Sequence, residues 1–261
     1  MTECAICWPA PALANWKGDQ ATASKMLSLP YGRPDTLADW TPALILCIRL
    51  LSRKGSIMAS ALPIGVAPVE LRPTQVTLGF REVDVKRRLW READDAQRAK
   101  ILRRHVVPTV VGPKNRHFII DHHHFAKAMI DEKVSLIAVF VVANLGDLAK
   151  DEFWTVLDNR AWCHAYDAKG QRRALSIIPK SLTELTDDPY RSLAGELIRA
   201  GGCAKNSVPF SEFLWADFLR RRIKLSLVNT DFGGALVQAL ELARGTEAKS
   251  LPGWSGADPA N

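Results

Sequence analysis

The chain has 261 residues, of which 47% are hydrophobic and 24% are charged, a globular composition that excludes a disordered or fibrous chain. Its formal net charge of +7 favours an anionic partner, such as a nucleotide or a nucleic acid. No run of about 20 apolar residues occurs, so no transmembrane helix is predicted, and an odd set of five cysteines predicts no disulfide framework and a reducing, cytoplasmic location.

Residues 1–58 differ from the rest of the chain. Prolines and tryptophans are scattered through them, and neither a helical nor a strand period is present. Met58, followed by Ala59 and Ser60, is typical of a natural protein start. We therefore predict that residues 1–58 are a disordered N-terminal extension, added by an upstream start codon. Finding peptides from this segment in cells would contradict the upstream-start hypothesis.

A core is predicted over residues 59–145, and its first half is mostly helical. Residues 64–71 are expected to be extended, and residues 74–79 to form a loop. Residues 81–104 repeat apolar side chains at helical spacing, with a second face dense in lysine and arginine. The sequence predicts one long basic helix there.

The clearest local signal is a β-hairpin. Residues 106–111 (VVPTVV) and 116–120 (RHFII) are apolar and largely β-branched, and a turn rich in Gly, Pro and Asn separates them. Pro108 indicates either an edge strand or the start of a strand. A helix is expected directly after Asp121, and then a buried strand over residues 135–142.

The remainder, residues 146–250, is predicted to be helical and packed on the core. Helical periods, start signals and stop signals mark four segments: 148–159, 188–200, 209–222 and 232–243. The expected fold class is α+β, with a small mixed sheet followed by helices.

The junction between the hairpin and its following helix carries the best candidate site. Asp121 is placed to cap that helix, and His122, His123 and His124 fill its first turn. Unpaired N–H groups and the helix dipole at such a position bind phosphate, and imidazoles there can bind phosphate or act as acid or base. Because successive helical side chains point about 100° apart, the three histidines cannot all bind one metal. The alternative is an ordinary cap followed by packing or surface histidines.

The stretch Ile120-Asp121-His122-His123-His124-Phe125 resembles the motif that follows the hairpin in the ParB/sulfiredoxin superfamily. Its Asp-His-His-His is similar to the branch named "putative ParB-like nuclease". That resemblance extends from about Leu62 to the C-terminus. Its first run is Arg72-Pro73-Thr74-Gln75, followed by Gly79, Glu82, Val83 and Lys86. Three more runs come later: Pro179-Lys180-Ser181-Leu182, Asp187-Asp188-Pro189-Tyr190-Arg191-Ser192-Leu193-Ala194 and Glu212-Phe213-Leu214-Trp215-Ala216. The chain departs from the superfamily motif where His122 replaces a glycine and Phe125 replaces an arginine.

The resemblance implies a core that cradles nucleotide phosphates at this junction, with ATP, ADP or CTP and Mg²⁺ as candidate cofactors. It implies catalytic candidates that could serve as acids, bases or metal-binding carboxylates, namely His122, His123, His124 and Glu82. It also implies binding residues, namely Asp121, Gln75, Gly79, Lys86 and Lys127. Nuclease and phosphoryl-transfer chemistry are both left open.

Two other functions stay open beside this one. The first is a non-catalytic module that binds DNA or a partner protein, with the basic residues of 86–104 and 220–224 against a nucleic-acid backbone. No helix-turn-helix stands out, which disfavours sequence-specific binding of the chromosome-partitioning type. The second is a manganese phosphoesterase of the Asp-His-His class, which would also need an Asp-x-Asp motif that this chain lacks.

Overall fold

The computed structural model describes residues 62–256, which belong to one compact unit. The extension predicted for residues 1–58 lies almost entirely outside the described residues and stays a prediction. Across residues 62–256, every helix is too short or too polar to cross a bilayer.

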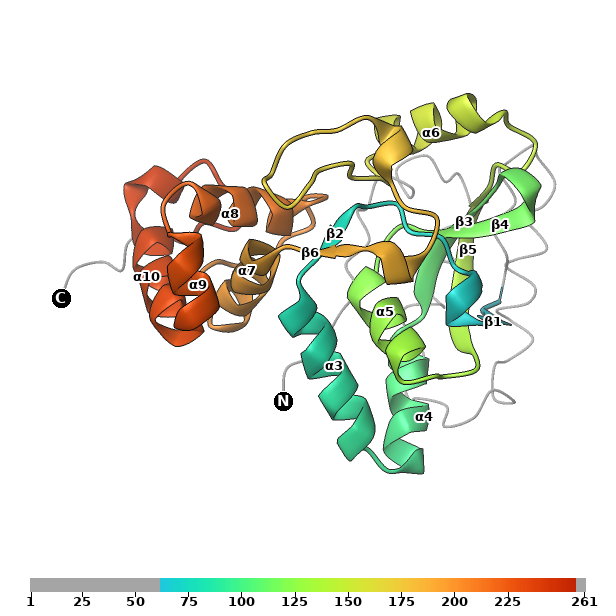
Figure 1. The fold of residues 1–261 in the computed structure, drawn as a ribbon, viewed down its shortest axis with the longest axis horizontal. Helices are drawn as coiled ribbons and strands as arrows, with labels where there is room; N and C mark the ends of the chain where they lie inside the picture. The colour runs from blue at the N-terminus through green and yellow to red at the C-terminus, as the bar shows by residue number, and fades with distance from the viewer. Residues whose placement is uncertain (1–61, 257–261) are drawn as a thin grey trace, which may run out of the picture. The chain divides into compact units, whose positions relative to one another are not determined.

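A mixed four-stranded sheet forms the centre of the fold (Figure 1), with the strand order β1(Ile64–Val66), β5(Ile137–Asn144), β3(Val107–Gly112), β4(Arg116–Ile119). β3 pairs in parallel with β5 and antiparallel with β4, and β1 is antiparallel to β5. The predicted hairpin is therefore confirmed as β3 and β4. Pro108 is the second residue of an interior strand, so the start-of-strand alternative is the correct one.

A β-bulge in β5 turns the later residues of the strand to the opposite face of the sheet. Thr109 pairs with Val141 and Val110 pairs with Ala143, which leaves Val142 as the extra residue. Consequently Val139 joins the apolar cluster of helix α5(His123–Asp131), whereas Ala143 joins the cluster of helix α6(Lys150–Asn159).

The long basic helix predicted for residues 81–104 is wrong, because two helices occupy that stretch. These are α3(Phe80–Glu92) and α4(Asp95–Arg104). One helix ends at Glu92, and the next begins after its N-cap residue, Asp94. The Asp94 side chain accepts the Gln97 N–H, and the Gln97 side chain accepts the Asp94 N–H. This reciprocal capping box stabilises a new helix start, and it outweighs the apolar period that runs through both segments.

Residues after 145 also complete the core. β6(Thr186–Asp187) pairs in parallel with β2(Thr77–Leu78). β2 lies within residues 74–79, for which a loop was predicted. Leu182 and Leu185 are buried in the same cluster as Val83 and Phe125. Short 3₁₀ turns connect the elements: Pro68–Glu70, Pro113–Asn115, Leu175–Ile177, Leu182–Glu184 and Thr246–Ala248.

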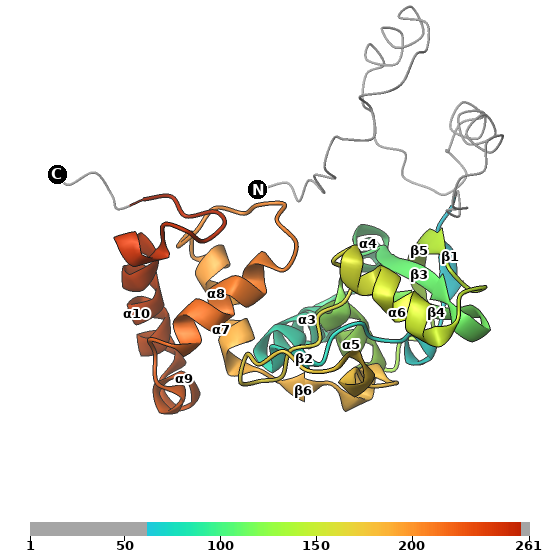
Figure 2. The same cartoon turned by 90° about the horizontal axis from the view of Figure 1, so that it is seen from above.

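Four helices follow, and they gather around an apolar cluster of their own (Figures 1 and 2). They are α7(Pro189–Arg199), α8(Ser211–Arg220), α9(Leu225–Thr230) and α10(Phe232–Arg244). α9 was not predicted, because six residues are too few to show a helical period. The buried indole of Trp215 and the buried Leu193 and Leu219 belong to this cluster.

Helices α3 and α7 come into direct contact where the two clusters meet. A Cβ on Gly79, the N-cap residue of α3, would lie 2.6 Å from the backbone nitrogen of Ser192. Likewise, a Cβ on Gly195 would lie 2.8 Å from Oε1 of Glu82. Gly79 therefore requires glycine, since a larger residue would meet backbone and push the helices apart, whereas at Gly195 the Glu82 side chain would have to move.

Candidate functional site

The chain turns from β4 into α5 through one left-handed residue. His122 has φ 63° and ψ 25° and occupies the N-cap position of α5. The prediction that Asp121 caps this helix is wrong, because the N-cap residue is His122 and the Asp121 carboxylate accepts only the N–H of that next residue, at 2.6 Å. Glycine adopts this conformation freely and histidine is among the residues that tolerate it. This explains how His122 can replace the glycine of the related motif.

His123 is a buried structural residue. Its side chain is 5% exposed, and Nε2 accepts the Thr74 N–H at 3.2 Å. The Thr74 hydroxyl in turn donates to the carbonyl oxygen of Ile119 at 2.8 Å. Burial, and then the charge of Arg191, lowers the pKa of His123 to about 3, so the ring is neutral near pH 7.

His124 also accepts a backbone N–H from the segment that precedes α3. Its Nε2 accepts the Gly79 N–H at 3.1 Å. Burial holds its pKa well below the ordinary value, and the charges of Arg191 and Lys86 lower it further. His123 and His124 together fix the segment from Thr74 to Gly79 against the start of α5.

The His122 ring stays partly open to solvent. Its side chain is 26% exposed, and its ring meets that of His105 edge-on at 5.9 Å. Burial lowers its pKa, the Asp121 carboxylate opposes that effect, and Lys86 and Lys205 are among the cationic groups that reinforce it. Positive charge from three separate segments therefore converges on the start of α5.

The backbone at this point can hold an anion. The left-handed His122 followed by right-handed helix turns successive N–H groups toward one side, a geometry that binds anionic oxygen. Within residues 62–256, the N–H groups of His123, His124 and Phe125 have no hydrogen-bond acceptor. Asp121 is the exposed carboxylate beside them.

The other predicted binding residues divide into two groups. Gly79 and Lys86 lie at the junction, and Lys86 pairs with no carboxylate of the described residues. Gln75 is buried and its backbone bridges to that of His164. Lys127 donates to both carboxylate oxygens of Asp131, at 2.6 and 2.8 Å. Its ammonium group therefore forms an ion pair within α5.

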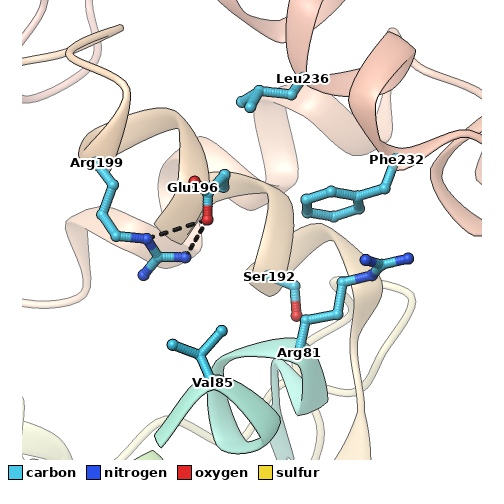
Figure 3. A pocket seen from close by; sticks show the side chains of 7 residues that line it. All are labelled: Arg81, Val85, Ser192, Glu196, Arg199, Phe232 and Leu236. Atoms are coloured by element: carbon cyan, nitrogen blue, oxygen red, sulfur yellow. Dashed lines mark hydrogen bonds and ion pairs between the residues drawn. The ribbon is translucent and has the colours of Figure 1, made fainter. Parts of the chain in front are cut away.

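Glu82 lies at the α3–α7 contact and forms an ion pair with Arg199. Arg199 also pairs with Glu196 beside a small cavity of about 290 Å³ between α3, α7 and α10, as Figure 3 shows. The structure thus gives Glu82 a part in joining two helices. Its predicted role as a base or metal ligand stays a prediction.

Arg191 was not singled out from the sequence. It is 4% exposed, its guanidinium stacks 3.4 Å from the centre of the Phe213 ring, and its nearest carboxylate, Glu212, lies 3.6 Å away. Its Nε and Nη1 atoms are buried without a hydrogen-bond partner. The sequence signal that could have identified Arg191 is a charged residue on the apolar face of α7. Buried arginines are rare unless they are paired.

The buried histidines predict a loss of stability in acid. The pKa of His123 is about 3 in the folded chain against an ordinary 6.5, so the unfolded chain binds more protons between these values. Stability from this residue is complete above pH 6.5 and is lost as the pH falls toward 3, by about 2 kcal/mol at pH 5. Urea unfolding at pH 7.5 and 5.0 measures the loss. His123→Gln, which keeps an acceptor for Thr74 and does not titrate, is expected to lose less; an equal loss in both proteins would contradict the assignment.

The described residues do not assemble the metal centre of an Asp-His-His phosphoesterase. No three His, Cys, Asp or Glu side chains within residues 62–256 converge as ligands. His123 and His124 already direct Nε2 at backbone N–H groups. The junction as built offers backbone donors and cations, which suit an anion.

Comparison with known proteins gives two findings. Residues 64–221 match the protein family described as "Putative ParB-like nuclease". The chain is also similar to a solved structure, "protein Atu1540 from Agrobacterium tumefaciens", with 48% identity and a TM-score of 0.70 over 75% of this chain and 99% of that one. No curated protein matches.

Proposed function

The chain belongs to the family described as "Putative ParB-like nuclease", and on this premise we propose that it binds a phosphate group of a nucleotide or nucleic acid at the start of α5. One observation carries the proposal: the first N–H groups of α5 have no acceptor among residues 62–256, and the charge of Lys86 acts on His122 and His124 in that same turn. Backbone N–H groups at a helix start and a nearby lysine are the donors that phosphate prefers.

Each residue of the junction has a distinct part in this proposal. The N–H groups of the first turn of α5 hold phosphate oxygens, Lys86 adds charge, and the His122 ring donates from the open side. His123 and His124 position the loop that closes the site. Asp121 is the carboxylate that would hold Mg²⁺ brought by nucleotide phosphates, because Mg²⁺ sites of this kind use one or two carboxylates and the phosphates themselves.

Binding is favoured here over turnover. Of the four residues predicted to be catalytic, His123 and His124 use Nε2 to accept backbone N–H groups, and Glu82 is paired with Arg199. His122 is left as the group that could move a proton in nuclease or phosphoryl-transfer chemistry. A switch-like module that binds nucleotide without hydrolysing it fits this arrangement.

Isothermal titration of the full chain with ATP, ADP and CTP, each with and without Mg²⁺, tests the proposal. We expect saturable binding of at least one nucleotide and a loss of about tenfold in Lys86→Gln, the value of roughly one charge-assisted hydrogen bond. Lys100→Gln, on the exposed surface of α4, is the matched control and is expected to bind normally. Equal affinity in the two variants would place the phosphate elsewhere.

Removing the His122 ring is expected to weaken nucleotide binding about tenfold without unfolding the chain. His122→Gly suits the backbone, because glycine adopts φ 63° without strain, and we expect the free energy of unfolding to stay within about 1 kcal/mol. Lys114→Gly is the control, since Lys114 has the same φ of 63° in the hairpin turn. Nucleotide titration and thermal unfolding of both variants test this prediction. If His122→Gly binds nucleotide as tightly as Lys114→Gly, the His122 ring has no role in binding.

A further inference from the structure

A second cavity, of about 680 Å³, lies between the segment that follows α6 and helix α8. Small-molecule sites in proteins usually have volumes of roughly 300–1,000 Å³. The residues that line this cavity do not include His122, His123 or His124, so it is distinct from the α5 junction. The two are joined through Thr74, which accepts the His164 N–H on one side and donates to His123 on the other.

One wall of this cavity is aromatic. The His164 ring stacks on Tyr166 with centroids 4.1 Å apart and planes 13° apart, and it lies 3.7 Å from Phe213 and 4.6 Å from Phe210. Phe210 holds a left-handed backbone conformation with φ 59°, which is unusual and costly for a bulky residue. Four rings therefore line one space, and flat ring systems stack well on such a wall.

His164 gives that wall a polar edge. No hydrogen bond to its ring nitrogens is present within residues 62–256, although the side chain lines the cavity. Burial, and then the charges of Arg191 and Arg172, lowers its pKa to about 3. At neutral pH the ring consequently offers one N–H donor and one acceptor nitrogen.

The charged groups around the cavity are already paired with one another. Asp188 pairs with Arg220, Asp217 with Arg220 and Arg221, and Asp158 with Arg172. Asp167, the fourth carboxylate of the lining, pairs with Arg173, so within residues 62–256 every carboxylate that lines the cavity is paired. The side chains of Arg172 and Arg221 are 61% and 69% exposed, so guanidinium donors extend from its rim toward solvent.

We infer that this cavity binds the base of a nucleoside or nucleotide. The base would stack on the ring of Tyr166 and exchange hydrogen bonds with His164, while phosphate or sugar would extend toward Arg172 and Arg221. Every nucleobase has a flat face and an edge that carries donors and acceptors, which are the two features that this wall complements. The inference goes beyond the proposed function, because a phosphate near Arg172 and Arg221 would lie outside the α5 site and the two sites are tested separately.

Saturation-transfer NMR on the full chain with adenosine, guanosine, cytidine and uridine tests the base site, and titration with inorganic pyrophosphate tests the α5 site independently. We expect signal from the base protons of at least one nucleoside. His164→Ala and Tyr166→Leu are each expected to weaken that nucleoside at least tenfold and to leave pyrophosphate binding unchanged. Circular dichroism shows whether each variant folds, and the second variant keeps the test valid if the first does not fold.

Two controls make the outcomes separable. His117→Ala changes a partly buried histidine on β4 that is outside the cavity lining, and Lys86→Gln changes the α5 site; both are expected to keep nucleoside binding. Absence of nucleoside binding, or equal binding by His164→Ala and wild type, would overturn the base site. If pyrophosphate still binds in that case, the proposed phosphate site survives, and if pyrophosphate also fails to bind, both fall.

Discussion

Replacing Gly79 by alanine is expected to lower the free energy of unfolding by about 2–3 kcal/mol, because the new methyl group overfills a packed contact. A Cβ there would lie 2.6 Å from both the backbone nitrogen and the hydroxyl oxygen of Ser192. Relief requires α3 to move away from α7, which would also lengthen the hydrogen bond from the Gly79 N–H to His124. Urea denaturation of the full chain measures the change.

Gly65→Ala is the matched control for this prediction. Gly65 lies in β1, and its Cβ would meet nothing nearer than the Leu136 side chain at 3.7 Å, an ordinary contact. We expect that variant to stay within about 0.5 kcal/mol of wild type. Equal stability of the two variants would show that α3 and α7 do not approach each other as closely as described.

Replacing Arg191 by methionine is expected to weaken nucleotide binding at least tenfold while leaving thermal stability unchanged or raised. Arg191 is buried, two of its nitrogens lack hydrogen-bond partners, and the carboxylate with which it pairs, that of Glu212, is 3.6 Å away and 49% exposed. Burying a cation with so loose an ion pair costs several kcal/mol, which an apolar side chain of similar length avoids. Its charge nevertheless acts on His123 and His124 at the start of α5, so an anion there is stabilised by it.

Arg220→Met supplies the contrast. Arg220 pairs with Asp188, which is 2% exposed, and with Asp217. Removing the arginine strands a buried carboxylate, so we expect a loss of about 3–5 kcal/mol of stability. Thermal unfolding and nucleotide titration of both variants test the assignment. A strong loss of stability in Arg191→Met, with binding unchanged, would make Arg191 a structural residue only.

The sequence predicted those parts of the fold that have strong local signals. The β3–β4 hairpin, the start of α5 and the family resemblance all follow from adjacent residues, and the match over residues 64–221 confirms the family. The break at Asp94 was missed because its capping box lies within a continuous apolar period. The pairing of β2 with β6 was missed because two residues per strand, more than 100 positions apart, leave no periodic pattern.

Site residues were harder to predict than elements. Their spacing placed three histidines at a helix start, but it could not show that two rings turn inward to hold Thr74 and Gly79. Those bonds join residues 49 and 45 positions apart, so they depend on tertiary packing alone. Arg191 is a similar case, because its charge acts on the start of α5, which lies more than 60 positions earlier in the sequence.

Backbone amide chemical shifts of the full chain, recorded while pyrophosphate and then ADP are added, test the phosphate site most directly. We expect the largest saturable shifts at the amides of His123, His124 and Phe125, together with the side-chain resonances of His122 and Lys86. Saturable shifts centred on other residues, or no saturable shift at this helix start with either ligand, would contradict phosphate binding at the start of α5.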